Sequence, residues 1–90
     1  MLRLRLSRTA NSFLTTRQPN HQRRIAARIQ TLRADPSPTD SIALKGAGQP
    51  FKRADIGEYR IIYRVEADTL FVAAIGKRND AEVYRRFRKK

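Results

Sequence analysis

The chain contains no cysteine and no tryptophan, and it has one histidine and eight acidic residues among its 90. Without cysteine it can form neither disulfides nor thiolate metal sites, which fits a reducing, cytoplasmic location. A single histidine excludes the histidine pairs found in zinc sites. The acidic residues fall mostly at expected turns, and none forms the spaced carboxylate set of a magnesium nuclease or a glycosidase. We therefore expect no metal and no other cofactor.

Long hydrophobic runs are absent as well. No apolar stretch approaches the roughly 18 residues of a membrane-spanning helix. The first residues, Met-Leu-Arg-Leu-Arg-Leu, are too short and too alternating for a signal peptide. We expect no association with a membrane.

What the chain does have is positive charge. Lys and Arg number 20, of which 15 are Arg, and the formal net charge is +12. Residues 1–34 hold eight Arg and no acid, and the last ten residues hold five basic residues and one acid. Charge of this size, spread over several segments, predicts binding to a polyanion or to an acidic protein. It does not separate a nucleic-acid enzyme from a passive binder.

The N-terminal half predicts one strand and two helices. Residues 2–6 alternate Leu and Arg, which is typical of a strand with one buried face. The serine before residues 8–16 can cap a first helix. A second helix opens at Pro19 or Asn20 and runs to residue 34, with apolar residues at helical spacing. Near its start lies the single histidine, which we interpret as exposed and without a partner that would orient it for catalysis.

The C-terminal half predicts a sheet. Residues 35–50 form a linker-like stretch that holds three of the four prolines and two of the four glycines. Three strands and a final helix follow at residues 51–55, 58–65, 69–77 and 81–90. The order β-α-α-β-β-β-α predicts a single α+β domain over residues 1–90, with a helical hairpin packed on a mostly antiparallel sheet.

The strand at 58–65 sorts its side chains onto two faces. Tyr59 and Tyr63 share the face that we expect the helices to cover, whereas Arg60 and Arg64 share the other, open face. An arginine in such a half-buried strand needs a partner. Phosphate is one candidate for that partner. A cross-strand salt bridge to Glu58 or Glu66 is the alternative.

The turn before this strand decides which basic residue joins Arg60. A two-residue turn that pairs Asp55 with Glu58 would place Arg53 directly across from Arg60. A bulge would bring up Lys52 instead. The sequence does not decide between Arg53 and Lys52.

Arg78 follows the last strand and Tyr84 lies six residues later, where the chain could fold back toward Arg60. Such a cluster suits metal-free cleavage of RNA, in which the 2′-hydroxyl attacks the adjacent phosphate and leaves a 2′,3′-cyclic phosphate and a 5′-hydroxyl. Basic side chains can stabilise the phosphorane. A tyrosine can stack on a base or handle the 2′-hydroxyl proton. Phosphate contacts away from the scissile bond are predicted for Lys45, Arg64, Lys77, Arg85, Arg86 and Arg88.

The stretch Gly57-Glu58-Tyr59-Arg60-Ile61-Ile62-Tyr63, followed by Gly76-Lys77-Arg78 and Glu82-Val83-Tyr84, resembles the RelE/ParE superfamily of bacterial toxins. The resemblance implies a type II toxin of microbial-RNase-like fold. RelE-type members cut messenger RNA in the ribosomal A site, and ParE-type members poison DNA gyrase.

The resemblance also implies residue roles and is closer to the RelE branch. Arg78 matches the arginine that protonates the leaving group, Tyr84 matches the tyrosine that orients the nucleotide, and Arg60 is common to both branches. RelE-type toxins carry two basic residues two apart on the second strand of this hairpin sheet. Here Lys52 or Arg53 supplies the first, but the second falls on Ala54 or Asp55. The implied catalytic set is Arg60, Arg78, Tyr84, Lys52 and Arg53.

Three functions follow as hypotheses. The preferred one is a ribosome-dependent mRNA endoribonuclease that inhibits translation. The alternatives are a toxin that poisons DNA gyrase and a non-catalytic RNA- or DNA-binding module. For either toxin we expect a cognate acidic antitoxin whose partly disordered segment folds on contact with the basic surface.

Overall fold

The computed structural model describes residues 1–44, 50–79 and 83–84. Its elements are β1 (Arg3–Leu6), α1 (Arg8–Thr15), α2 (Pro19–Ala34), β2 (Ile42–Ala43), β3 (Lys52–Ile56), β4 (Tyr59–Glu66) and β5 (Thr69–Lys77). Val83 and Tyr84 are helical, while the rest of the predicted final helix lies outside the described residues. Among the described residues, no helix has the length and apolarity needed to cross a bilayer.

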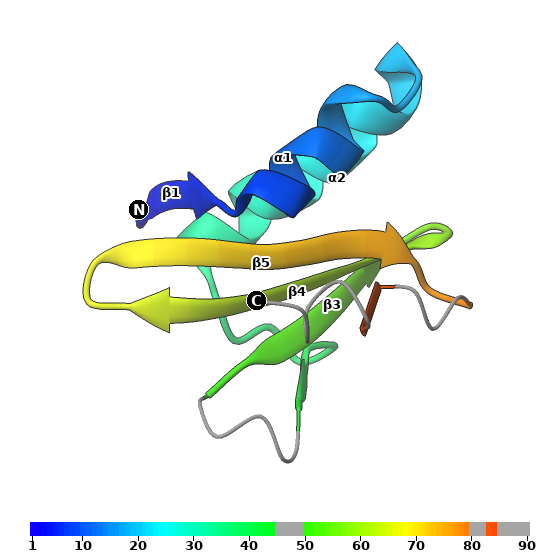
Figure 1. Cartoon of the computed structure of the whole chain (residues 1–90). Helices are drawn as coiled ribbons and strands as arrows, with labels where there is room; N and C mark the ends of the chain where they lie inside the picture. The colour runs from blue at the N-terminus through cyan, green and yellow to red at the C-terminus, as the bar shows by residue number, and fades with distance from the viewer. Residues whose placement is uncertain (45–49, 80–82, 85–90) are drawn as a thin grey trace.

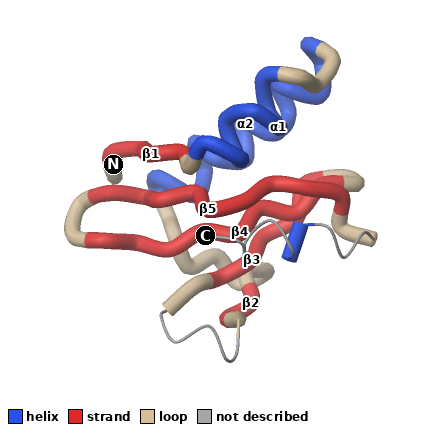
Figure 2. Tube along the Cα trace, viewed as in Figure 1, coloured by secondary structure: helices blue, strands red, loops and turns tan. Residues whose placement is uncertain are grey.

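The strands form one five-stranded sheet in the order β1-β5-β4-β3-β2 (Figure 2). β1 pairs in parallel with β5, and the other neighbours pair antiparallel. The predicted α+β class and mostly antiparallel sheet are therefore confirmed. The two-residue strand β2 was not predicted, because it is too short to show a period within a stretch rich in proline and glycine.

The helical hairpin covers one face of the sheet, as Figure 1 shows. Ser7 caps α1 as predicted, since its hydroxyl accepts a hydrogen bond of 3.1 Å from the Ala10 amide. The same hydroxyl donates one of 2.6 Å to the Ala73 carbonyl, which fastens the helix start to β5. The core between helices and sheet consists of Ala10, Phe13, Ile25, Ile29, Leu32, Ala54, Tyr59, Ile61, Tyr63, Leu70, Val72 and Ile75.

A second, smaller apolar cluster lies on the opposite face, which we call the open face. It consists of Phe51, Ile62, Phe71, Ala73, Ala74 and Val83, with Leu44 and Tyr84 against it. Val83 reaches the sheet because Gly76 has no side chain: a Cβ there would lie 2.7 Å from the Cβ of Val83. This close approach positions Tyr84 over the open face.

The turn between β3 and β4 corrects the predicted register. Gly57 adopts φ of 56° and, with Glu58, makes a two-residue turn that pairs Ile56 with Tyr59. Asp55 therefore lies opposite Arg60, where Arg53 or, with a bulge, Lys52 was predicted. The glycine decides the outcome, because the first position of such a turn favours a residue that tolerates positive φ.

Candidate functional site

The centre of the candidate site is an ion pair between neighbouring strands on the open face. Nε of Arg60 donates to Oδ1 of Asp55 at 2.8 Å, and Nη2 donates to Oδ2 at 3.2 Å. The Arg60 side chain is 13% exposed and that of Asp55 is 32% exposed. Arg60 is thus nearly enclosed, whereas the carboxylate remains reachable from solvent.

Arg78 and Tyr84 meet this pair from separate segments. Nη1 of Arg60 donates a hydrogen bond of 2.8 Å to the hydroxyl of Tyr84. Nε of Arg78 lies 3.8 Å from Oδ2 of Asp55, and the Arg78 backbone amide donates to the Glu58 carbonyl. The structure therefore brings together the three residues that the resemblance singled out, and it gathers them around a carboxylate.

Arg53 completes the cluster. It pairs with Ile62 and shares the open face with Arg60, two residues along the sheet from the place predicted for it. Its charge, like those of Arg60 and Arg78, favours the ionised form of Asp55. The pKa of the Asp55 carboxyl is lowered, mainly by the hydrogen bond from Arg60 and against the effect of burial. The pKa of Arg60 is raised for the same reason.

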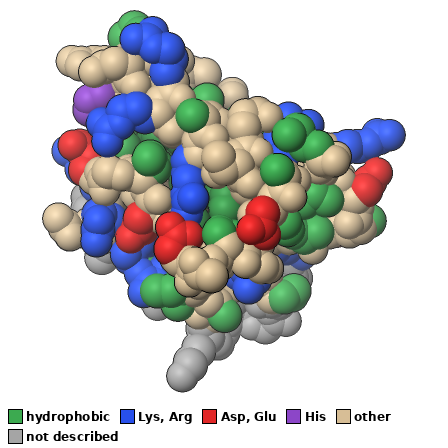
Figure 3. All heavy atoms as spheres, turned by 180° about the vertical axis from the view of Figure 1, so that it is seen from behind, with side chains coloured by type: hydrophobic (Ala, Val, Ile, Leu, Met, Phe, Trp, Pro, Cys, Tyr) green, Lys and Arg blue, Asp and Glu red, His purple; other side chains and the backbone are tan. Residues whose placement is uncertain are grey.

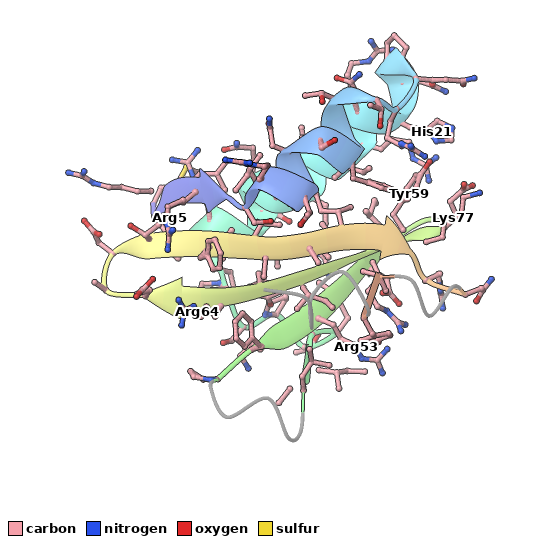
Figure 4. The ribbon with its side chains drawn as sticks, viewed as in Figure 1. Arg5, His21, Arg53, Tyr59, Arg64 and Lys77 are labelled. Atoms are coloured by element: carbon pink, nitrogen blue, oxygen red, sulfur yellow. The ribbon has the colours of Figure 1, made fainter. Side chains whose placement is uncertain are left out.

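The other predicted residues lie elsewhere. Lys52 pairs with Tyr63 and so belongs to the face that the helices cover. Arg64 forms a salt bridge with Glu66 at the far end of β4, away from Arg53 (Figure 4). Lys77 lies beside His21 at the end of the sheet, on the helical side (Figure 4). Lys45, Arg85, Arg86 and Arg88 lie outside the described residues.

The interpretation of His21 as an exposed residue without a partner was wrong. Its Nδ1 and the hydroxyl of the buried Tyr59 share a hydrogen bond of 2.6 Å, and the two rings meet edge to face. Together with Lys77 they line a surface pocket of about 260 Å³. The signal was present in the sequence, because His21 precedes the buried Ile25 by one helical turn and shares its face.

On the face seen in Figure 3, the basic side chains of the described residues do not gather into one continuous patch. Figure 3 shows them at several separate places on the back of the molecule, with the histidine at one edge beside basic residues. The charge of +12 is thus distributed widely, whereas the cluster around Asp55 is defined by contacts of 2.8 to 3.8 Å. Among the described residues, no group of three or more His, Asp or Glu side chains is placed to hold a metal ion.

The cluster has a clear chemical capacity. Three guanidinium groups and one carboxylate leave a net positive charge, which attracts phosphate. Of the five N–H groups of Arg60, Asp55 takes two and Tyr84 takes one, so two remain for an incoming oxygen. Such an arrangement can bind a phosphate beside a carboxylate and a phenol.

The chain matches the model of a protein family described as the ParE toxin of the type II toxin–antitoxin system parDE, over residues 5–82. A search of curated proteins gave no match in sequence. Among solved structures, the RelE–RelB complex of the archaeon Pyrococcus horikoshii OT3 is similar, with 27% identity, a TM-score of 0.75, and coverage of 89% of this chain and 98% of that chain.

Two further structures share the fold at lower identity. A mutant of the E. coli toxin RelE in the free state is 18% identical, with a TM-score of 0.79 and coverage of 98% of this chain and 95% of that chain. The RelBE2 toxin–antitoxin complex of Mycobacterium tuberculosis is 22% identical, with a TM-score of 0.67 and coverage of 86% of this chain and 98% of that chain.

Proposed function

Since the chain belongs to the ParE toxin family of type II toxin–antitoxin systems, within the RelE/ParE superfamily, we propose that it inhibits translation by cutting messenger RNA on the ribosome. The reaction needs no metal and leaves a 2′,3′-cyclic phosphate and a 5′-hydroxyl. The observation that carries the proposal is the convergence of Arg60, Arg78 and Tyr84 within one cluster.

Each residue of the cluster has a role in this proposal. The free N–H groups of Arg60 bind a non-bridging oxygen of the scissile phosphate and stabilise the charge of the phosphorane. Arg78 lies beside Asp55 at the rim and is 47% exposed, so it can reach the departing 5′-oxygen. Tyr84 orients the nucleotide, and Arg53 adds positive charge to the same face.

The remaining basic residues serve RNA binding away from the bond that is cut. Arg64 and Lys77 lie at opposite ends of the sheet (Figure 4), so they can contact only more distant phosphates. Lys52 is on the other face and does not take part in catalysis in this proposal. Slow cleavage of free RNA is expected, because the cluster consists of Arg, Tyr and Asp side chains and contains no histidine, the commonest general acid or base at neutral pH.

A cognate antitoxin is part of the proposal. Two of the similar structures are complexes of a toxin with its antitoxin, which supports such a partner here. With a net charge of +12, the toxin should bind an acidic antitoxin segment.

A second candidate function is poisoning of DNA gyrase. Two observations favour it. Asp55 occupies two donors of Arg60, whereas the resemblance to the RelE branch implies a second basic residue at position 54 or 55, and the matched family is described as parDE. A carboxylate at this position weakens attraction for phosphate. An interaction with gyrase would not need the cluster to bind RNA.

The test uses the full chain in a gyrase-free translation extract, with cut sites on the message mapped by primer extension. Wild type should cut the translated message, and the double variant Arg78→Ala/Tyr84→Ala should not. Arg3→Ala is the control for loss of charge. Arg3 lies on the edge strand β1, is 81% exposed and forms an ion pair with Asp68. Intact message together with DNA breaks in the presence of gyrase would replace the first function by the second.

A further inference from the structure

Asp55 is the one proton acceptor that faces the cluster among the described carboxylates. Glu58 lines the pocket beside His21, Glu66 pairs with Arg64 at the far end of β4, and Asp68 pairs with Arg3. Two of the approximately four lone-pair sites of the Asp55 carboxylate receive the N–H groups of Arg60. Its remaining lone pairs and its 32% exposure leave room for a hydroxyl group.

The other groups that could take a proton are poorly placed. Lys52 lies on the face that the helices cover, opposite Tyr63. His21 is bonded to Tyr59 on that same face. The Tyr84 hydroxyl already accepts a hydrogen bond from Arg60, which occupies one of its lone pairs.

The ion pair with Arg60 also favours Asp55 as the proton acceptor. In the free protein Arg60 holds the carboxylate ionised, so no proton must leave before it can act. An incoming phosphate can bind the same guanidinium through its two remaining N–H groups. The negative charge of the phosphate offsets the charge of Arg60 that Asp55 feels, so the carboxylate becomes more basic.

We propose that Asp55 is the general base of the cleavage, a role that rests on the proposed function. A carboxylate oxygen takes the proton of the 2′-hydroxyl as the O2′–P bond forms and the P–O5′ bond breaks. The departing 5′-oxygen takes a proton from Arg78, which regains one from water, and Asp55 returns its own proton to water. The products are the 2′,3′-cyclic phosphate and the 5′-hydroxyl.

The test measures single-turnover cleavage on ribosomes programmed with a short message. Asp55→Asn keeps the shape of the side chain and removes the base, so the rate should fall by about 10²- to 10⁴-fold. Asp40→Asn is the matched control: Asp40 also accepts a 2.8 Å hydrogen bond from an arginine, Arg28, but lies away from the cluster. Its rate should stay at the wild-type level.

Two readouts separate a base from a residue that only holds Arg60 in place. The wild-type rate should be nearly independent of pH around neutrality, whereas the Asp55→Asn rate should rise with pH because hydroxide must replace the base. A message with sulfur in place of the scissile 5′-oxygen needs no proton on its leaving group. It should restore cleavage by Arg78→Ala but not by Asp55→Asn.

Each result has a distinct meaning. Asp55→Asn cutting within about twofold of wild type, or slower with an unchanged flat pH profile, would overturn the general-base role and leave the proposed function standing. Rescue of Asp55→Asn by the sulfur-containing message would also overturn it. Absence of cutting by wild type would instead remove the proposed function itself.

Discussion

The hydroxyl of Tyr84 accepts a hydrogen bond of 2.8 Å from Nη1 of Arg60, although 24 residues separate them in the chain. The bond joins the helical segment after β5 to the start of the central strand β4. Arg60 is held on its other side by Asp55, so its guanidinium is fixed from two directions. A guanidinium fixed in this way binds phosphate without first losing conformational freedom.

Tyr84→Phe should therefore slow cleavage more than it affects the fold. The change removes one hydrogen bond to Arg60 and keeps the ring, so a loss of roughly two- to tenfold in rate is expected. Primer extension on a translated message measures it. Tyr63→Phe is the control, because the Tyr63 hydroxyl bonds to the Pro36 carbonyl on the covered face. Equal rates for the two variants would contradict a role of Tyr84 in the cluster.

The ion pair of Asp55 and Arg60 should make the free energy of unfolding depend on pH. The pKa of Asp55 is lower in the folded protein than in the unfolded chain, where it is near 3.9. The pair therefore contributes its full stability above about pH 5 and loses it as the pH falls through the unfolded and then the lowered folded pKa. Urea unfolding should show wild type more stable than Asp55→Asn at pH 6, with the difference shrinking below pH 4.

Asp68→Asn gives the comparison for a surface pair. Asp68 and Arg3 are 73% and 81% exposed, and such pairs contribute little to stability. This variant should differ little from wild type at pH 6. A difference between wild type and Asp55→Asn that stays constant down to pH 3 would show that the pair does not stabilise the fold.

The fold was predictable wherever the sequence repeats a period. Alternation in β4 assigned Tyr59 and Tyr63 to the covered face and Arg60 to the open one, and burial confirms this division. Helical spacing of Ile25 and Ile29 gave α2. These signals are strong because a whole element must bury one side.

The site was less predictable, because it depends on the pairing register between β3 and β4, which a shift of one residue changes. Pairing Asp55 with Arg60 follows from where Gly57 places the turn, and a shift of that turn changes every partner across β3 and β4. The bulge after Ile62 leaves no period in the sequence either. Asp55 was consequently interpreted as the loss of a basic residue, whereas it lies at the centre of the cluster.

Gly76→Ala should displace the segment that carries Tyr84. The added Cβ would lie 2.7 Å from the Cβ of the fully buried Val83, so one of the two must move. Overpacking of this kind costs about 1–3 kcal/mol of unfolding free energy. Chemical denaturation measures the loss, and NMR shifts of Arg60 should report its weakened contact with Tyr84. A variant with wild-type stability and unchanged Arg60 signals would contradict the close packing.

The bond between His21 and Tyr59 can be measured by a double-mutant cycle. His21→Phe and Tyr59→Phe each keep a ring for the edge-to-face contact and remove one partner of the 2.6 Å hydrogen bond. Because the Tyr59 side is buried, we expect a coupling free energy of about 0.5–1.5 kcal/mol from urea unfolding of the four proteins. The pair His21→Phe and Tyr63→Phe is the control and should be additive, since the Tyr63 hydroxyl bonds elsewhere. Additivity in both pairs would mean that the hydrogen bond between His21 and Tyr59 adds nothing to stability.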